Sequence, residues 1–375
     1  MGIANEWPMV KLGDIQRKVS SINPTKFPDQ QFSLYSIPAY DAGVPEKILG
    51  SGIKSNKIEL QPGDILLSKI VPHIRRSWIV GEHDTSSIGS SEWIVYQDDR
   101  LDPRYLQNFL LSDYFHAQFL QTVAGVGGSL NRARPAAVAQ ISIPIPPIAE
   151  QRRIAEILHT VVTAINDCER QLASLSQIQA NILTYTEQAD HVPFSRLAKI
   201  RSGTVQPSEH PFCNLPHVAP DNIESGTGRL KNVNTASEDA VTSNKYEFYA
   251  GDLLYSKIRP YLNKFAIPLF NGICSADMYA LIPTQPATAE YLAMIIRSRR
   301  FLAYAEQQSG RSSIPKINRK ALTAFPVPFH SESEIQRVTK IYQAVESTRS
   351  KLQLKIDGLK ELQNSLSTRA FAGKL

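Results

Sequence analysis

Two segments of the sequence place a serine and a lysine in nearly the same frame, GDILLSKIVP from Gly63 and GDLLYSKIRP from Gly251. A hydroxyl and an ammonium group can both donate hydrogen bonds to phosphate oxygens, and the ammonium is positively charged. The candidate phosphate contacts are Ser68, Lys69, Ser256 and Lys257. The alternative is structural, because glycine permits a tight turn, aspartate accepts hydrogen bonds from loop N–H groups and the apolar residues fit a buried strand.

The residues after these frames differ, VPHIRRSW in the first copy and RPYLNKFA in the second. If the ligand is DNA, its phosphates are the same along the duplex, and contacts that select a base would lie where these two segments differ. Arginine can pair with guanine and asparagine with adenine. The candidates in these stretches, each of which can instead be a solvated surface residue, are His73, Arg75, Arg76, Arg259, Tyr261, Asn263 and Lys264.

Two loops further along each copy, GVGGSLNRARPA and SGRSSIPKINRK, combine small residues with basic ones. A flexible basic loop can approach a phosphate backbone closely. The candidates here are Arg132, Arg134, Arg311 and Lys316. A plain solvated loop is the alternative interpretation.

Motifs for catalysis are missing from the sequence. No Asp or Glu is followed two residues later by Lys, and no G-x-x-x-x-G-K-[ST] loop occurs. DPRY at Asp102 differs from the Asp-Pro-Pro-Tyr of adenine methyltransferases at Arg104, so it predicts a helix start. The 8 histidines form no H-x-x-x-H pair, and the 3 cysteines lie far apart. We expect no catalytic residue, no metal site and no disulfide.

Composition indicates a soluble, core-forming chain of 375 residues with a net charge of +6. Residues 1–149 hold 14 basic and 14 acidic residues, whereas residues 191–333 hold 16 and 11, so the positive charge lies in the second half. The sequence shows neither a signal peptide nor a membrane span. We expect a cytoplasmic protein with no membrane partner.

The resemblance between the copies extends over the whole chain and predicts a tandem duplication. IGSSEWIV at Ile88 matches ICSADMYA at Ile273, and YLQNFLLS at Tyr105 matches YLAMIIRS at Tyr291. Each copy has a head of short apolar runs separated by Gly, Pro and Asn, which predicts mixed strands and short helices. Each head ends at a proline-rich stretch, IPIPP or FPVP.

Apolar residues recur every seven positions after each proline-rich stretch, from Ile154 in the first copy and from Val338 in the second. This period predicts two long amphipathic helices with a coiled-coil seam. Because few residues separate the first helix from the second head, the helices can pair only as an antiparallel coiled coil. We therefore expect an α+β fold, a pseudo-twofold dumbbell of two mixed α/β heads in tandem separated by this coiled coil. The predicted boundaries are 1–146 and 189–328 for the heads, and 147–188 and 329–375 for the helices.

The motifs WPMVKLGDI at Trp7, PGDILLSK at Pro62, IPIPPIAEQRRIAEI at Ile143 and STRAFAGKL at Ser367 resemble the specificity subunit of type I restriction-modification systems. The most specific of them is Pro-Pro-x-x-Glu-Gln-x-x-Ile. Its second occurrence has Ile335 in place of Gln151, which predicts that the two helix starts differ as docking surfaces.

The resemblance implies a non-catalytic subunit that binds double-stranded DNA. Each head would be a target-recognition domain that reads one half of a split, asymmetric site. Two modification subunits, which are adenine methyltransferases, would dock on the helices, and a helicase-nuclease restriction subunit would join for cleavage. No cofactor is expected in this chain, and S-adenosylmethionine, ATP and Mg are expected on the partner subunits.

Two other functions fit the residues taken alone. A duplicated two-headed chain can be a bivalent scaffold that binds protein or glycan, and an active methyltransferase in one chain would require S-adenosylmethionine to bind the isolated protein. Steep salt dependence of binding distinguishes nucleic acid from glycan.

The first helix is predicted to set the separation between the half-sites. Four residues inserted near Gln179 should lengthen it by about 6 Å and nearly restore the helical face. The preferred gap between half-sites should then grow by about one or two base pairs, since DNA rises about 3.4 Å per base pair. The methylation motif formed with the modification partner measures this gap. A one-residue insertion is the control, because it rotates the seam by about 100°, breaks helix pairing and should therefore reduce activity more than the four-residue insertion does. An active four-residue variant with an unchanged gap contradicts the prediction.

Overall fold

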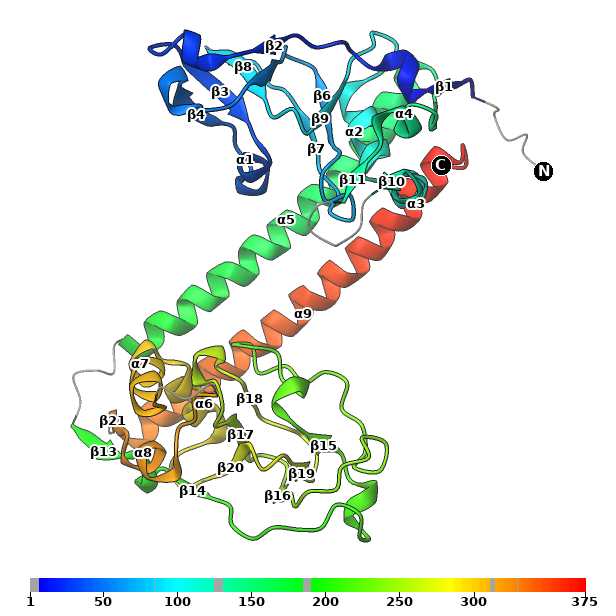
Figure 1. Ribbon diagram of the computed structural model, residues 1–375. Helices are drawn as coiled ribbons and strands as arrows, with labels where there is room; N and C mark the ends of the chain where they lie inside the picture. The colour runs from blue at the N-terminus through cyan, green and yellow to red at the C-terminus, as the bar shows by residue number, and fades with distance from the viewer. Residues whose placement is uncertain (1–6, 84, 125–130, 185–189, 311–313, 329) are drawn as a thin grey trace. The chain divides into compact units, whose positions relative to one another are not determined.

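The computed structural model describes residues 7–83, 85–124, 131–184, 190–310, 314–328 and 330–375 (Figure 1). The chain forms two compact units. Unit 1 contains residues 1–168 and 355–375, and unit 2 contains residues 169–354. Each unit therefore includes one head and part of both long helices.

Unit 1 is built on one mixed sheet and one antiparallel sheet. The larger has the strand order β2-β5-β8-β3-β4, in which only β3 and β8 run parallel among the described pairs. Its strands are β2 (Ser21–Ile22), β3 (Gln31–Tyr35), β4 (Glu46–Leu49), β5 (Lys57–Glu59) and β8 (Ser86–Gly89). The smaller is antiparallel, with β6 (Ile65–Ser68) between β7 (Ser77–Ile79) and β9 (Trp93–Tyr96). Two short ribbons pair β1 (Met9–Lys11) with β12 (Ser142–Pro144), and β10 (Val123–Ala124) with β11 (Arg132–Ala133).

Unit 2 has the same kinds of sheet. An antiparallel sheet has the order β14-β20-β17-β18, and a mixed sheet has the order β15-β19-β16. Their strands are β14 (Ala198–Ile200), β15 (His217–Val218), β16 (Tyr246–Phe248), β17 (Leu253–Ser256), β18 (Phe265–Ala266), β19 (Gly272–Cys274) and β20 (Met278–Pro283). A ribbon pairs β13 (His191–Pro193) with β21 (Pro326–Pro328).

Three short helices follow one order in both units, which supports the predicted duplication, and unit 1 has one further helix before them. Unit 1 contains α1 (Ile37–Ala42), α2 (Pro103–Leu111), α3 (Asp113–Gln121) and α4 (Pro135–Val138), and unit 2 contains α6 (Ala289–Arg297), α7 (Arg299–Gln308) and α8 (Arg319–Ala324). Single 3-10 turns are η1 (Leu12–Ile15), η2 (Pro24–Lys26), η3 (Gly50–Gly52), η4 (Phe194–Arg196), η5 (Phe212–Asn214), η6 (Pro220–Asn222) and η7 (Pro260–Leu262). Asp102 accepts hydrogen bonds from the N–H groups of Arg104 and Tyr105, so DPRY starts a helix as predicted.

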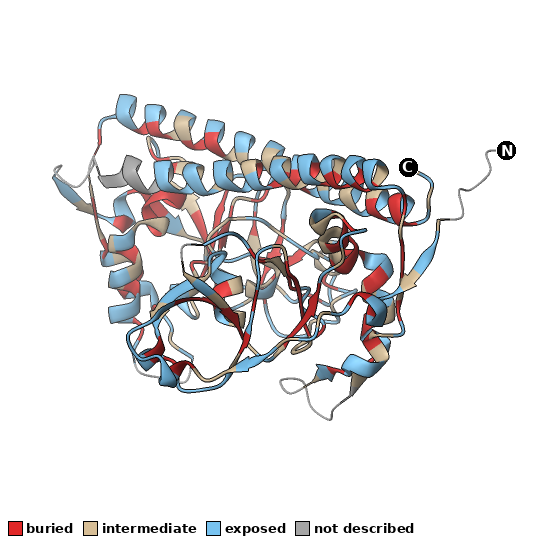
Figure 2. Ribbon diagram, turned by 90° about the horizontal axis from the view of Figure 1, so that it is seen from above, coloured by how far each residue is buried: buried red, intermediate tan, exposed pale blue. Residues whose placement is uncertain are grey.

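Two long helices cross the boundary between the units, α5 (Ile148–Thr184) and α9 (Glu332–Phe371). In unit 1, Ile154 near the start of α5 lies in the same apolar cluster as Phe371 at the end of α9. In unit 2, Arg349 from the middle of α9 donates to Ser176 of α5 at 3.3 Å. The order of these contacts is that of an antiparallel pair. Buried positions recur along both helices (Figure 2), as the seven-residue period predicted.

Each glycine–aspartate turn of the repeated frame contains a buried ion pair. Asp64 is 0% exposed and accepts from Nε of Arg17 at 2.7 Å and from the N–H of Gln61 at 2.7 Å. In the same way, Asp252 accepts from Nη2 of Arg201 at 2.9 Å and from the N–H of Tyr249 at 2.8 Å. The preceding glycines have φ of +86° and +89°, a conformation that side chains rarely adopt. The aspartate of the frame is therefore structural in both units.

Removal of Arg17 should destabilise unit 1, because the Asp64 carboxylate would stay buried without its partner. We expect Arg17→Ala to lower the free energy of unfolding by about 3 kcal/mol. The midpoint of urea unfolding of the full chain measures the change. Arg100→Ala is the control, since the Arg100 side chain is 59% exposed in its pair with Asp98, and it should have little effect. Equal shifts of the unfolding midpoint for Arg17→Ala and Arg100→Ala would show that the buried pair stabilises unit 1 no more than the exposed pair does.

Candidate nucleic-acid interface

In unit 1 the chain brings the divergent stretch after β6 beside the basic segment at β11. Ile70 forms a β-bridge with Arg132, and the N–H of Val71 donates to the carbonyl of Asn131 at 3.1 Å. Ala133 N–H donates to the carbonyl of Lys69 at 2.8 Å. Two predicted sets of site residues, 63 residues apart in the chain at Lys69 and Arg132, therefore lie side by side. We call residues 69–76 and 131–134 the loop pair of unit 1.

Unit 2 repeats this arrangement with different side chains. Ile258 forms a β-bridge with Lys316, and the N–H of Arg259 donates to the carbonyl of Pro315 at 2.8 Å. Arg259 and Asn263 both have positive φ, at 47° and 45°, and enclose the single turn η7. Residues 257–264 and 314–319 form the loop pair of unit 2. Arg311, a predicted contact, lies outside the described residues.

The two serines of the repeated frame are not available to bind phosphate. Ser68 is 2% exposed and its hydroxyl donates to the carbonyl of Ile70 at 3.1 Å. Ser256 is 1% exposed and donates to the carbonyl of Ile258 at 3.0 Å. The expectation of phosphate contacts at Ser68 and Ser256 is corrected: each serine fixes the start of its loop, which is the structural alternative.

The lysines of the frame are partly exposed. Lys69 has no side-chain hydrogen bond or ion pair among the described residues. The ammonium of Lys257 lies 5.5 Å from the centroid of the Tyr279 ring. Burial lowers the pKa of Lys257, with a smaller opposing effect of the Asp277 carboxylate. Both lysines remain candidates for phosphate contact.

The adjacent arginines of the first loop have different environments. Arg76 is 8% exposed and donates to both carboxylate oxygens of Asp41, at 2.8 and 2.9 Å. Arg75 is exposed, forms an ion pair with Asp113 at 2.5 Å and donates to the carbonyl of Leu111 at 3.1 Å. Arg76 is therefore a structural residue, contrary to expectation, and Arg75 stays a candidate.

The remaining candidates of unit 1 are exposed. Arg132 pairs with Glu92 at 3.0 Å, and Arg134 donates to the carbonyl of Thr122 at 3.3 Å. His73 projects from the loop with an exposed side chain. The arginines of this loop pair are thus held by carboxylates or carbonyls of the same unit.

In unit 2 the candidates at the loop tip are less restrained. Arg259 and Tyr261 are exposed, and neither side chain has a hydrogen bond or ion pair within the described part of the chain. Lys264 donates to the carbonyl of Pro220 at 2.7 Å, and Lys316 lies 3.2 Å from a carboxylate oxygen of Asp277. Asn263 is 9% exposed, so the expectation that it contacts adenine is not supported.

Some residues of interest were missed in the sequence. Arg319, the last residue of the loop pair of unit 2, and Lys320, which follows it, are exposed at the start of α8. The tripeptide Ser-Asn-Lys occurs in both units, at the start of β5 in unit 1 and directly before β16 in unit 2. Lys245 is 3% exposed and donates to the carbonyl and hydroxyl of Ser243 at 2.6 and 2.8 Å. The repetition of this tripeptide is the signal that could have identified it.

Gln151, the most specific residue of the proline-rich motif, is fully buried. Its amide donates to the carbonyls of Arg100 and Pro146, both at 2.8 Å, and its oxygen accepts from the N–H of Asp102 at 2.8 Å. These bonds connect the start of α5 to the start of α2. The counterpart Ile335 is 1% exposed in an apolar cluster, so neither residue is itself a docking surface.

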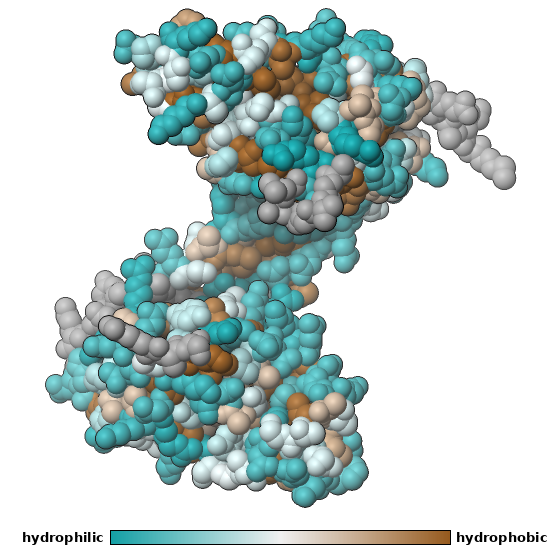
Figure 3. Space-filling view, in the orientation of Figure 1, coloured by the Kyte–Doolittle hydropathy of each residue, from teal (hydrophilic) through white to brown (hydrophobic). Residues whose placement is uncertain are grey.

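The described residues contain no group of three or more His, Cys, Asp and Glu side chains that could hold a metal ion. None of the described helices is long and apolar enough to span a membrane. The exposed surface is mostly hydrophilic in Figure 3, with hydrophobic side chains in separate patches. The paired basic loops are therefore the candidate site that the structure favours in each unit.

The family model for the type I restriction modification DNA specificity domain matches residues 4–177. The chain is 29% identical over 300 residues to the type I restriction enzyme EcoDI specificity subunit of Escherichia coli, covering 68% of this chain and 67% of the relative. It is 22% identical over 293 residues to the EcoKI specificity subunit of Escherichia coli (strain K12), covering 66% and 61%. The alignments thus span about two thirds of each relative's length.

Solved structures share the fold. A chain from a study of complex assembly and conformational transition of the type I R-M system has a TM-score of 0.59 at 20% identity, with full coverage of both chains. The S subunit of the type I restriction-modification system from M. genitalium has a TM-score of 0.56 at 14% identity, covering 99% of this chain and 98% of that one. The predicted architecture of tandem mixed α/β units with long helices is confirmed.

The chain is similar to type I restriction-modification DNA specificity subunits, and its residues 4–177 match the model of their DNA specificity domain. It is a DNA-recognition subunit and has no catalytic function of its own.

Arg75 and Arg76 should respond differently to substitution. Arg76→Ala should lower the free energy of unfolding by about 1 to 2 kcal/mol, because its bidentate pair with the half-exposed Asp41 is lost. Arg75→Ala should leave the unfolding midpoint nearly unchanged and relax one position of one half-site. Urea unfolding and methylome sequencing with the modification partner measure the two effects. If a stable Arg75→Ala protein lost recognition of both half-sites equally, Arg75 would be assigned to a phosphate contact.

Proposed function

We propose that each unit reads one half of a split, asymmetric double-stranded DNA site through its loop pair. The observation that carries this proposal is the repeated bridge, Ile70 to Arg132 and Ile258 to Lys316, which joins two basic segments on one common scaffold. Because the scaffold is shared and the exposed side chains differ, the two half-sites should differ in sequence. The similarity to type I specificity subunits gives no support to the alternative of a scaffold that binds protein or glycan.

The proposed DNA contacts are the accessible members of the two loop pairs. In unit 1 they are Lys69, His73, Arg75, Arg132 and Arg134, and in unit 2 they are Lys257, Arg259, Tyr261, Lys264 and Lys316, with Arg311 retained from the sequence. Arg259 and Tyr261 have the least restrained side chains. They can adopt the orientation that DNA requires without first breaking an internal bond.

The family assembles with the other subunits of restriction-modification complexes. We propose two modification subunits docked on α5 and α9, with a restriction subunit joining for cleavage. S-adenosylmethionine, ATP and Mg would be bound by these partners, and the complex would act in the cytoplasm.

A change at Arg259 tests the proposal through salt dependence. Arg259→Gln should weaken binding of duplex DNA and reduce the slope of log K against log[salt] by about 1, because one phosphate contact is lost. Fluorescence anisotropy of labelled duplex between about 50 and 200 mM salt measures the slope. Arg196→Gln, an exposed arginine of η4 outside the loop pair, is the control and should leave the slope unchanged. An unchanged slope for Arg259→Gln removes Arg259 from the interface, and a flat slope for the native chain contradicts the proposed function.

A further inference from the structure

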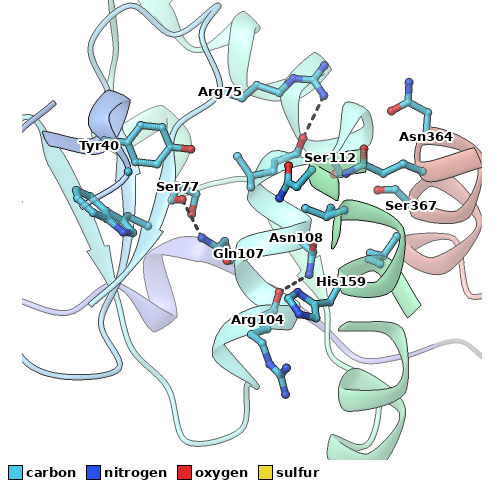
Figure 4. Close-up of a pocket in the computed structure, with 17 residues that line it drawn as sticks. Tyr40, Arg75, Ser77, Arg104, Gln107, Asn108, Ser112, His159, Asn364 and Ser367 are labelled. Atoms are coloured by element: carbon cyan, nitrogen blue, oxygen red, sulfur yellow. Dashed lines mark hydrogen bonds between the residues drawn. The ribbon is translucent and has the colours of Figure 1, made fainter. Parts of the chain in front are cut away.

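Unit 1 contains a cavity of about 710 Å³ between the sheet that carries β7 and the helices α2, α5 and α9 (Figure 4). Its lining residues all belong to unit 1. A cavity of this volume is in the range of small-molecule sites. Neither the ion pairs of the loop nor the packing of the long helices requires such a space.

The lining is polar but almost uncharged. Tyr40 and Trp78 form an aromatic wall, and none of the described lining residues carries a carboxylate. The two arginines at the cavity are already paired, Arg75 with Asp113 at 2.5 Å and Arg104 with Glu156 at 3.6 Å. A small cation would find no counter-ion there, and a free phosphate would have to compete with internal carboxylates.

Two amide side chains of α2 present acceptor oxygens. The Gln107 amide donates to the carbonyl of Ser77 at 2.9 Å, and the Asn108 amide donates to the carbonyl of Arg104 at 2.8 Å. Neither amide oxygen accepts a hydrogen bond within the described residues. Because the NH₂ groups are engaged, the orientation of the oxygens is fixed.

Ser77 adds an independent indication of a ligand. The residue is 1% exposed, lines the cavity, and its hydroxyl has no hydrogen-bond partner in the described structure. Buried polar atoms are nearly always satisfied, so an unsatisfied hydroxyl at a cavity indicates a missing partner. Figure 4 shows Ser77 and Gln107 on one side of the cavity, with Asn364 and Ser367 opposite.

We propose that this cavity binds a nucleobase with an exocyclic amino group, presented by an unstacked nucleotide of the bound DNA. Aromatic walls with amide groups are the combination that recognises bases by stacking and by their edges. Adenine, cytosine and guanine carry an amino donor that matches the acceptor oxygens, whereas thymine carries none. The cavity borders Arg75 of the loop pair, so the inference rests on the proposed function and names an additional contact for it.

Binding of free nucleosides to the full chain tests the proposal. Deoxyadenosine and deoxycytidine, titrated by calorimetry, should bind about tenfold more tightly than thymidine, the loss expected for one missing donor–acceptor match. Asn108→Ala should weaken deoxyadenosine binding by a similar factor. Gln118→Ala is the matched control, because Gln118 of α3 also donates to the carbonyl four residues earlier but does not line the cavity. Gln107→Met repeats the loss of an acceptor at a second position, and unfolding midpoints verify that each variant is folded.

Three results would overturn the proposal while leaving the proposed function intact. In the first, the chain binds duplex DNA but no nucleoside. In the second, thymidine binds as tightly as deoxyadenosine and deoxycytidine. In the third, Asn108→Ala and Gln118→Ala weaken deoxyadenosine binding equally. If the native chain binds no nucleoside and the Asn108→Ala variant no longer binds the modification subunit, the cavity would be assigned to a segment of that protein. Absence of duplex binding by the native chain would instead contradict the proposed function.

Discussion

The buried pair of aspartate and arginine in each repeated frame is the constraint on which both units depend. Asp64 and Asp252 are almost completely buried, and burying a charged group is costly unless it is paired and hydrogen-bonded. Arg17 and Arg201 supply the charge, and the turn supplies an N–H group. The turn fixes where β6 and β17 begin, and these strands position the loops at their other ends. A recognition surface can therefore change its exposed side chains while its frame is retained.

The two loop pairs differ in whether their arginines are paired with carboxylates of the same unit. In unit 1 the arginines Arg75, Arg76 and Arg132 each contact a carboxylate of the same unit. Each of these arginines is held in one orientation by its carboxylate partner. A fixed orientation favours specificity for particular bases more than it increases the overall affinity for DNA. In unit 2, Arg259 has no such restraint within the described residues, and a freer cation is better suited to neutralise phosphates. Two units with one fold can therefore contribute differently to affinity and to specificity.

The seven-residue period of apolar residues and the repeated sequence frame were sufficient to predict most of the architecture, because both patterns reflect which residues are buried. The seven-residue period located α5 and α9, and the repeated frame located β6 and β17. The site was harder to predict, since partners distant in the chain decide whether a side chain is available. No local pattern indicates that Asp41 covers Arg76, or that Ser68 bonds to the carbonyl of Ile70. The adjacency of Lys69 and Arg132 follows from strand pairing that composition does not encode.

The starts of α5 and α9 show that a recognisable sequence motif need not be a contact surface. Tyr105 and Tyr291 each donate to a proline carbonyl, Pro144 or Pro328, so this bond is common to both units. Unit 1 then uses the amide of Gln151 to satisfy three backbone groups of two helices and a turn.

Unit 2 reaches the same geometry by other means. Ser331 and Glu334 form a capping box, with the Ser331 N–H donating to the Glu334 carboxylate at 2.8 Å. That bond and the hydroxyl of Ser331 lower the pKa of Glu334, with the hydroxyl contributing most. Ile335, at the position of Gln151, packs instead in an apolar cluster of unit 2. The glutamine of the motif meets a requirement of folding, and both Gln151 and its counterpart Ile335 are buried, so the exchange changes no exposed surface. If partner subunits dock on these helices as proposed, they would contact exposed residues such as Arg152, whose side chain is 68% exposed, and not the buried Gln151.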